Sequence, residues 1–233
     1  MTSDEALESL HTYFAPLSEL QFTRGGVKVL YTPKSPVLGL NAAYGYSPEA
    51  DAFFVGKYAP SLFLLLESQV LELFGPGSRG SFTLEQSIKV GLYSPTSELE
   101  QASYHVEPYY VEQVPWTRAG TAAGILAAAW LDASWSEMLT HHLSKSLERN
   151  REYLLLLAYP RRGETPVGTA LVQVSSRLRV HLWGTLEGHT LALGALLDTS
   201  SALLGTLEAV ETSLPSSWPF TLVNELELGY WHG

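Results

Sequence analysis

The sequence RVHLWGTLEGHTLALGALL, residues 179–197, decides the fold of this chain. Its first part, Arg179–Leu186, has the apolar content of a buried strand, and its second part turns at Gly188 and continues as a helix. Two further apolar strands, Tyr153–Tyr159 and Val167–Val174, lead into it. A strand that runs directly into a helix presents free backbone N–H groups at the helix tip, and such a tip suits an anionic ligand such as a pyrophosphate.

The order of elements in this region predicts a mixed α/β fold. A helix over Thr190–Leu204 joins Arg179–Leu186 to a strand over Thr206–Ser213, so these two strands should be parallel. The preceding strands have short connections and should be antiparallel. We therefore expect a mixed, mostly antiparallel sheet with helices on both faces. At the end of the chain we expect a short helix over Pro219–Leu226 and a last strand over Leu228–Trp231.

A polar segment divides the chain into two lobes. Ser94–Ser103 contains Pro95 and separates two periodic regions, which is typical of a linker. We predict one domain over residues 1–99 and a second over residues 104–233. The first part ends in helix–strand–helix–strand order, as the second does, so we interpret it as a worn copy of the same fold.

The charge of the chain is acidic and evenly spread. The formal net charge is −10, and the first 100 residues hold six Lys and Arg against 11 Asp and Glu, while the remainder holds eight against 13. Tight nucleic-acid binding needs clustered Lys and Arg to neutralise phosphates. No such cluster is visible beyond Arg161-Arg162 and Arg177/Arg179, so we expect no nucleic-acid partner.

Several other classes of site and location are disfavoured by composition. The chain has no cysteine, which excludes disulfides, thiolate metal ligands and cysteine nucleophiles. His141 and His142 would point about 100° apart on a helix, and no H-E-x-x-H motif accompanies them, so we expect no metal site. The N-terminus is acidic, unlike a signal peptide, and the longest apolar run, Ala122–Leu131, is shorter than the ~20 residues that span a bilayer. We therefore expect a cytoplasmic protein without a membrane partner.

Three short motifs resemble those of the GNAT superfamily of N-acetyltransferases. His189–Gly194 (HTLALG) corresponds to the phosphate loop of that family, which is patterned Gln/Arg-x-x-Gly-x-Gly/Ala. Val167–Ala170 (VGTA) resembles a strand motif of the family, and Leu228–Tyr230 (LGY) resembles its terminal leucine-glycine-aromatic motif. The resemblance covers the second part of the chain, and extends to the first part only faintly. Tandem members with a degenerate partner domain exist in this family.

The resemblance implies a fold in which one strand splays from its parallel neighbour and acetyl-CoA wedges into the gap. The pyrophosphate would lie on backbone amides at the start of the next helix. The cofactor-binding residues that the resemblance implies are Leu186, His189, Thr190, Leu191, Ala192, Leu193, Gly194 and Ala195.

This chain departs from the family pattern at three positions, so its phosphate loop is degenerate. His189 replaces Gln/Arg and supplies less positive potential than arginine. Ala192 replaces the first glycine, whose missing Cβ lets a phosphate approach the backbone. Glu225 occupies the position of the tyrosine that many members use as a general acid, and its carboxylate would repel a thiolate. Glu187 remains as a candidate general base, and Tyr230 as the nearest candidate acid.

Two functions follow from the resemblance. One is an acyl-CoA-dependent N-acetyltransferase acting on a small-molecule or peptide amine, and the acidic surface would favour a cationic acceptor. The other is a catalytically inactive pseudo-enzyme that keeps the fold as a binding or dimerisation module, which the three departures favour. An exposed edge strand in either lobe could pair across a homodimer.

Overall fold

The computed structural model describes residues 2–57, 62–74, 83–95, 109–175, 178–204, 207–210 and 220–232. The chain folds into two compact units. The first contains Met1–Val90 together with Glu225–Gly233, and the second contains Gly91–Asn224. The last nine residues therefore group with the N-terminal unit, although the sequence places them in the domain over residues 104–233. The linker expected over Ser94–Ser103 lies mostly outside the described residues.

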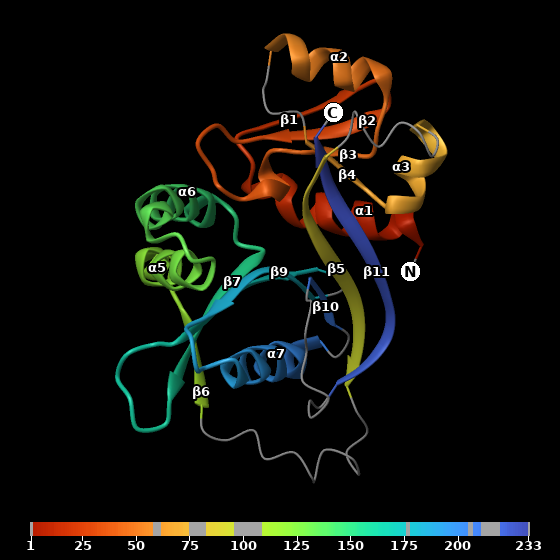
Figure 1. The fold of residues 1–233 in the computed structure, drawn as a ribbon. Helices are drawn as coiled ribbons and strands as arrows, with labels where there is room; N and C mark the ends of the chain where they lie inside the picture. Colours follow the sequence, from red (N-terminus) through yellow and green to blue (C-terminus); the bar gives the residue numbers. More distant parts are fainter. Residues whose placement is uncertain are drawn as a thin grey trace. The chain divides into compact units, whose positions relative to one another are not determined.

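The second unit is built around a sheet with the strand order β10-β9-β8-β7-β6 (Figure 1). Strands β6 to β9 pair antiparallel with their neighbours, whereas β9 and β10 are parallel. The elements are β6 (Tyr109–Val114), α5 (Ala119–Ala129), α6 (Ser136–Arg149), β7 (Tyr153–Pro160), β8 (Gly168–Val174), β9 (Leu178–Thr185), α7 (Leu191–Leu204) and β10 (Leu207–Val210).

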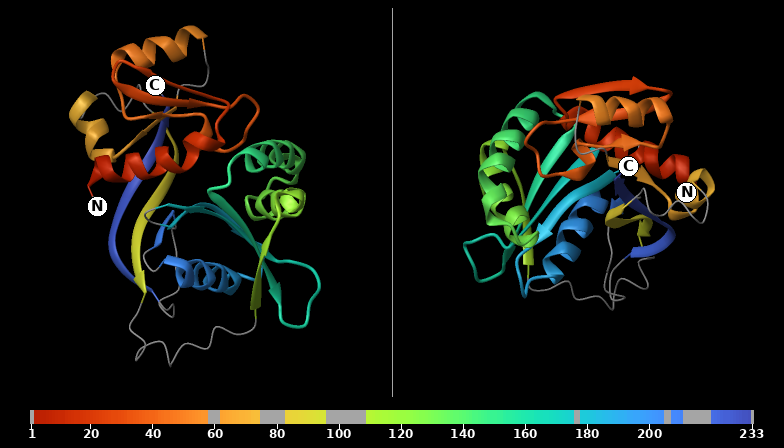
Figure 2. Two further views of the ribbon diagram at one scale, coloured as in Figure 1. Left: turned by 180° about the vertical axis from the view of Figure 1, so that it is seen from behind. Right: turned by 45° about the horizontal axis from the view of Figure 1, so that its top comes forward.

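Helices cover both faces of this sheet. Helix α7 packs across strands β6 to β10 on one face, while α5 contacts β7, β8 and β9 on the other, beside α6 (Figure 2). Alternate residues of the strands supply the core beneath α7, as period-2 patterning requires. This core contains Leu156, Ala158, Ala170, Val172, Leu178 and Val180 from the strands and Ala192, Leu193, Leu196 and Leu197 from α7.

The first unit has the strand order β1-β2-β3-β4-β11-β5. Its one parallel pair among the described ladders is β3 with β4, joined through α2. The elements are α1 (Ser3–Phe14), β1 (Leu20–Arg24), β2 (Val27–Tyr31), β3 (Ala43–Tyr44), α2 (Pro48–Lys57), β4 (Leu62–Leu65), α3 (Glu67–Phe74), β5 (Thr83–Pro95) and β11 (Phe220–His232).

The two units share an order of elements. Each has a helix, three antiparallel strands, a crossover helix and a parallel strand, namely α1-β1-β2-β3-α2-β4 and α6-β7-β8-β9-α7-β10. The predicted fold class is confirmed: each unit has a mostly antiparallel sheet with one parallel pair, and in the second unit helices lie on both faces.

The end of the chain differs from its sequence-based prediction. The short helix expected over Pro219–Leu226 is wrong, because β11 runs as one strand from Phe220 to His232. Buried Leu228 and Tyr230 lie two residues apart along it, which is the period of a strand. Strand β11 lies between β4 and β5, so both of its edges are bonded, and this pairing outweighs the local helix preference.

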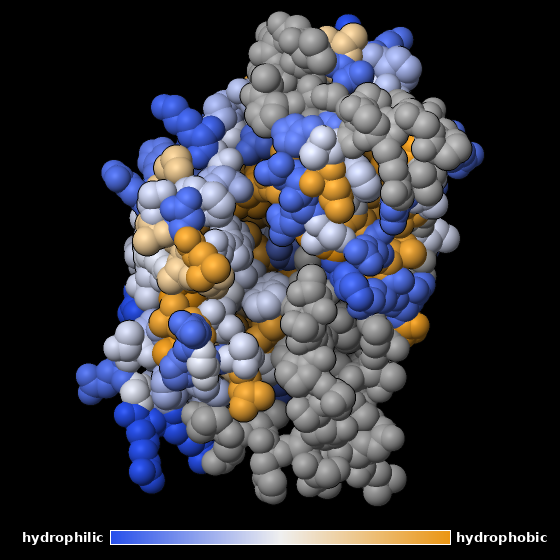
Figure 3. Space-filling model, viewed as in Figure 1, coloured by the Kyte–Doolittle hydropathy of each residue, from blue (hydrophilic) through white to orange (hydrophobic). Residues whose placement is uncertain are grey.

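The surface mixes polar and apolar side chains. Figure 3 shows hydrophilic and apolar residues interspersed on the face turned toward the viewer. The most exposed large apolar side chains of the described residues are Leu131, Val223 and Leu191. Among the described residues, no helix is long and apolar enough to cross a membrane.

Candidate functional site

Strand β9 carries an extra residue where it leaves its parallel partner. Between the pairs Leu171↔Leu182 and Gln173↔Arg179, β9 has one more residue than β8, which is a β-bulge near Val180. The pairing of β9 with β10 covers only Leu178 to Val180. The second half of β9 therefore runs free of β10, among the described residues, toward the tip of α7.

A tight turn connects β9 to α7. The amide of Leu186 donates to the carbonyl of Val167 at 2.8 Å, which fixes the end of the strand, and the amide of His189 donates to the carbonyl of Leu186 at 3.0 Å. Gly188 has φ +79°, a left-handed conformation that glycine adopts without penalty. The chain can thus reverse within three residues and enter the helix at Leu191.

The first turn of α7 presents exposed backbone at its tip. The amides of Ala192 and Leu193 donate to the carbonyls of His189 and Thr190 at 2.8 and 3.2 Å. Within the described part of the chain, no backbone bond of the turn uses the amides of Thr190 and Leu191. Both residues are exposed, so these two N–H groups can receive an anion from solvent.

The side chain of Ala192 points into the core instead of toward the tip. Ala192 is 0% exposed and belongs to the cluster beneath α7. A Cβ placed on Gly168 would lie 3.2 Å from the Cβ of Ala192 and 3.4 Å from that of Ala158. Small residues on β7 and β8 therefore let α7 approach the sheet at this end. Ala192, which the sequence resemblance aligns with a glycine, fills this contact with its methyl group, and the exposed residues of the turn lie on the other side.

His189 is held by a strand at the far edge of the sheet. Its Nδ1 lies 3.0 Å from the hydroxyl of Tyr109 on β6, and the two rings meet edge to face with centroids 5.9 Å apart. Tyr109 is 80 residues away in the sequence, and no motif pointed to it. Only the pairing of β6 beside β7 brings it to this end of the sheet.

Comparison with known proteins identifies this arrangement. No protein-family profile and no curated protein matches the chain. A GCN5-related N-acetyltransferase from Kribbella flavida matches with a TM-score of 0.59 at 14% sequence identity, over 97% of this chain and 95% of that chain. A conserved protein of unknown function from Staphylococcus epidermidis matches with a TM-score of 0.57 at 12% identity, over 92% and 93%. This chain has the GNAT fold.

The sequence resemblance implied a strand that splays from its parallel neighbour, and the described pairing of β9 with β10 ends at Val180, beside the bulge in β9. His181 lies at this bulge and is 7% exposed. Burial, with a smaller repulsion from Arg179, lowers the pKa of His181 to about 3. The imidazole therefore stays neutral near pH 7, and it brings no positive charge to this part of the GNAT fold.

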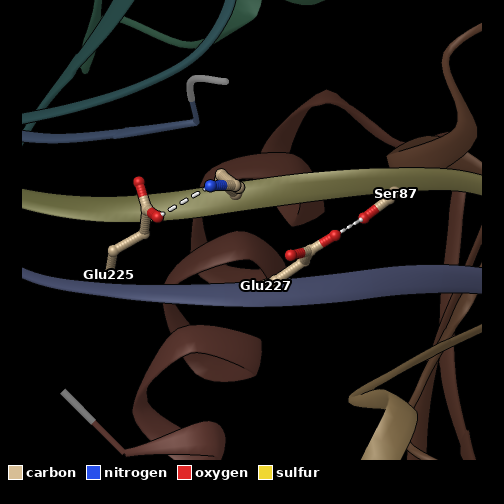
Figure 4. Close-up of polar contacts among 4 residues, drawn as sticks. Ser87, Glu225 and Glu227 are labelled. Carbon is tan, nitrogen blue, oxygen red and sulfur yellow. Dashed lines mark hydrogen bonds and ion pairs between the residues drawn. The ribbon is translucent and has the colours of Figure 1, made fainter. Parts of the chain in front are cut away.

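Glu225, which the sequence resemblance aligns with the general acid of many GNAT enzymes, is one member of an ion pair. Glu225 on β11 accepts a hydrogen bond from Lys89 on β5 at 3.1 Å, and Glu227 accepts one from Ser87 at 2.5 Å (Figure 4). The hydrogen bond and the negative charge of Glu225 raise the pKa of Lys89. The carboxylate at this position is thus partnered by an ammonium group, which offsets the repulsion expected from a bare Glu225.

The two candidate catalytic residues lie in different settings. Glu187 is exposed in the turn of the second unit, beside the proposed phosphate loop. Tyr230 is 4% exposed in the first unit, where it pairs with Leu64. Burial raises the pKa of Tyr230, so its phenol holds its proton tightly and has little access to a substrate.

In the first unit, the turn between β3 and α2 corresponds to the β9–α7 turn, but the N–H groups at the tip of its helix are not available to an anion. Gly45, with φ +109°, donates its amide to a β4 carbonyl at 3.3 Å, so β3 stays bonded to β4 up to the turn. The hydroxyl of Ser47 accepts from the amide of Ala50 at 3.1 Å, and Pro48 has no N–H to offer. Glu49 adds a negative charge in the first turn. Of these two crossover helices, α7 is the one whose tip suits an anion.

His232 pairs with Glu85 at 3.3 Å, but in the described part of the chain no histidine belongs to a larger group of metal-ligating side chains. His141 is exposed and His142 is buried, so the two adjacent rings point apart on α6. No group of three or more His, Asp or Glu among the described residues could hold a metal ion.

Proposed function

We propose that this chain is an acyl-CoA-dependent N-acetyltransferase whose cofactor site is the β9–α7 turn. The observation that carries this proposal is the orientation of Ala192, because its methyl group faces Gly168 in the core and does not fill the tip of α7. The loop departs from the GNAT sequence pattern, but its backbone N–H groups at the tip of α7 remain accessible to a phosphate.

The residues of the turn have distinct roles in this proposal. The amides of Thr190 and Leu191 and the ring of His189 would hold the pyrophosphate, while Leu186 and the buried residues Ala192–Ala195 fix the backbone that presents these groups. Acetyl-CoA would supply the acetyl group as a thioester. Among the described residues, the edge of β9 beyond the bulge is not paired with β10, and the rest of the cofactor would extend along its backbone hydrogen-bonding groups.

Positioning would supply most of the catalytic effect in this proposal. Two reactants held in a near-attack geometry react as if intramolecular, and oriented backbone N–H groups stabilise charge that develops on a carbonyl oxygen. Glu187 is the candidate base for the proton of the acceptor amine because its carboxylate is exposed beside the turn. The formal charge of −10 favours a cationic small-molecule or peptide amine as the acceptor.

A binding module without catalytic activity is the second candidate. The observation that favours it is the Lys89–Glu225 pair, which stands where many GNAT enzymes have a tyrosine. Acetyl-CoA binding without release of free CoA thiol from acetyl-CoA in the presence of any amine tested would support this alternative. Thiol release that depends on an added amine would exclude it.

Acetyl-CoA is expected to raise the melting temperature of the protein. Ligand at 100 times its dissociation constant stabilises the native state by about 2.7 kcal/mol, which corresponds to a shift of roughly 5–10 °C for a chain of this size.

Leu191→Asp should abolish this shift, since Leu191 is 52% exposed at the tip and a carboxylate there repels phosphate. Asp also suits the first turn of a helix, so the variant should remain folded. The matched control is Thr199→Asp, an exposed position farther along α7. No shift of the unmodified protein at millimolar acetyl-CoA would refute the proposed cofactor site.

Ala192→Gly is expected to leave acetyl-CoA affinity unchanged within about twofold. Its Cβ packs on the core side of α7, so removing it opens no new space at the tip. The variant should lose about 1–2 kcal/mol of stability, because a buried methyl group is lost and glycine is a poor helix former. Isothermal titration calorimetry and chemical denaturation measure the two effects. A tenfold gain in affinity would show instead that Ala192 obstructs the phosphate.

A further inference from the structure

The contact between Tyr109 and His189 joins two elements that no sequence motif connects. Tyr109 opens β6 at the edge of the sheet, and His189 lies in the turn before α7. The hydroxyl of Tyr109 is 3.0 Å from Nδ1 of His189, and the rings are nearly perpendicular at 81°. Both side chains are half-buried. The ring of His189 is therefore held from one side by a specific polar contact.

This contact distinguishes the two nitrogen atoms of the imidazole. A neutral histidine has one N–H donor and one lone-pair acceptor, and the partner of one nitrogen determines the state of the other. Because the Tyr109 hydroxyl occupies Nδ1, Nε2 is the ring atom left for a ligand among the described residues. An anion at the tip of α7 would need Nε2 to carry the proton.

We propose that Tyr109 is a positioning residue for the cofactor loop: its hydroxyl donates to Nδ1 of His189, keeps the ring proton on Nε2, and so orients that N–H as a donor to the pyrophosphate. This inference rests on the proposed function of the β9–α7 turn. The Tyr–His pair would thus supply the N–H donor that Gln or Arg supplies in the GNAT pattern. Gln and Arg carry N–H donors of their own and need no partner to orient a proton.

Tyr109→Phe tests the role of the hydroxyl without removing the ring. Loss of one hydrogen bond is expected to weaken acetyl-CoA binding about fivefold. The affinity for acetyl-pantetheine, which lacks the pyrophosphate, should not change. The control is Tyr110→Phe, the next residue on β6, whose ring stacks on Tyr159 with centroids 5.0 Å apart. Equal loss for both ligands, or no loss for acetyl-CoA, would overturn the inference.

A second variant separates positioning from general stability. His189→Arg carries its own donors, so Tyr109→Phe should have no effect on acetyl-CoA affinity in that background. In the His189→Ala background the tyrosine hydroxyl has lost its partner, and the effect should vanish there too. A fivefold loss that persists in both backgrounds would show that Tyr109 acts through the fold and would overturn the inference.

The tautomer of His189 can be measured without any ligand. Nitrogen-15 NMR of the unmodified protein should show the proton on Nε2, and Tyr109→Phe should give a mixture of the two tautomers. A proton on Nδ1 in the unmodified protein would overturn the inference, even if Tyr109→Phe failed to fold. If acetyl-CoA does not bind, the proposed function fails, while the tautomer measurement still decides the role of Tyr109.

Discussion

Removal of Glu225–Gly233 should unfold the first unit while the second unit keeps its structure. Strand β11 lies between β4 and β5, and four of these residues pair with Leu62–Leu65. Leu228 and Tyr230 are 1% and 4% exposed, and each such side chain contributes about 2–5 kcal/mol when it is lost from a core. The sum approaches the whole stability of a typical domain. Hydrogen exchange should show loss of protection in β2 and β4 and retained protection in β7 and β8.

Two point variants on the same strand provide the matched test. Leu228→Ala should destabilise the first unit by about 2–5 kcal/mol, because it leaves a cavity in the core. Val223→Ala, at a position that is 60% exposed, should change stability by less than about 0.5 kcal/mol. Equal effects of the two variants, or full protection of β4 after the truncation, would contradict the placement of β11 in the sheet of the first unit.

Stability should fall steeply with acidification because of His181. Its pKa is lowered to about 3 in the folded protein, chiefly by burial, against about 6.5 in an unfolded chain. The neutral form is thus favoured in the native state, so this contribution is fully present above about pH 6.5 and is lost as the pH falls toward 3. The loss approaches about 1.4 kcal/mol per pH unit below pH 6 and amounts to about 2 kcal/mol between pH 6.5 and 4.5.

A variant that cannot be protonated isolates this contribution. His181→Phe changes stability by an amount that includes a pH-independent packing difference. Relative to the unmodified protein, the variant should gain about 2 kcal/mol of stability between pH 6.5 and 4.5. Denaturant unfolding at each pH measures it. The control is His141→Gln, which removes an exposed histidine on α6 and tests whether the effect is specific to the buried one. A pH-independent difference for His181→Phe would mean that the imidazole is not held neutral by burial.

Much of the second unit could be predicted from residue patterns. Strands β7, β8 and β9 lie within one residue of their predicted ranges. The parallel pairing of β9 with β10 follows from the helix between them. These elements are governed by local apolar runs and turn residues, which a single sequence carries.

The site was less accessible to prediction. Ala192 stood out in the sequence as a departure that would obstruct a phosphate, but the structure turns its side chain toward Gly168. Glu225 stood out as a bare carboxylate, but it is paired with Lys89 on β5. Tyr109 was not singled out at all. In each case the residue that it contacts is distant in the sequence, so composition and motif spacing could not predict the contact.

The sequence by itself determined the strand–turn–helix at residues 179–197, since its apolar run, its glycine turn and its helix are local properties. Only the tertiary structure decided what this turn presents. The packing of α7 on Gly168 hides one side of the first turn, and β6 brings Tyr109 to His189. It also decided that the last strand belongs to the first unit, because the edges of β4 and β5 bind it on both sides. The pairing of a strand depends on which strand edges are available and which faces are buried in the whole fold, and a local segment of sequence does not specify either.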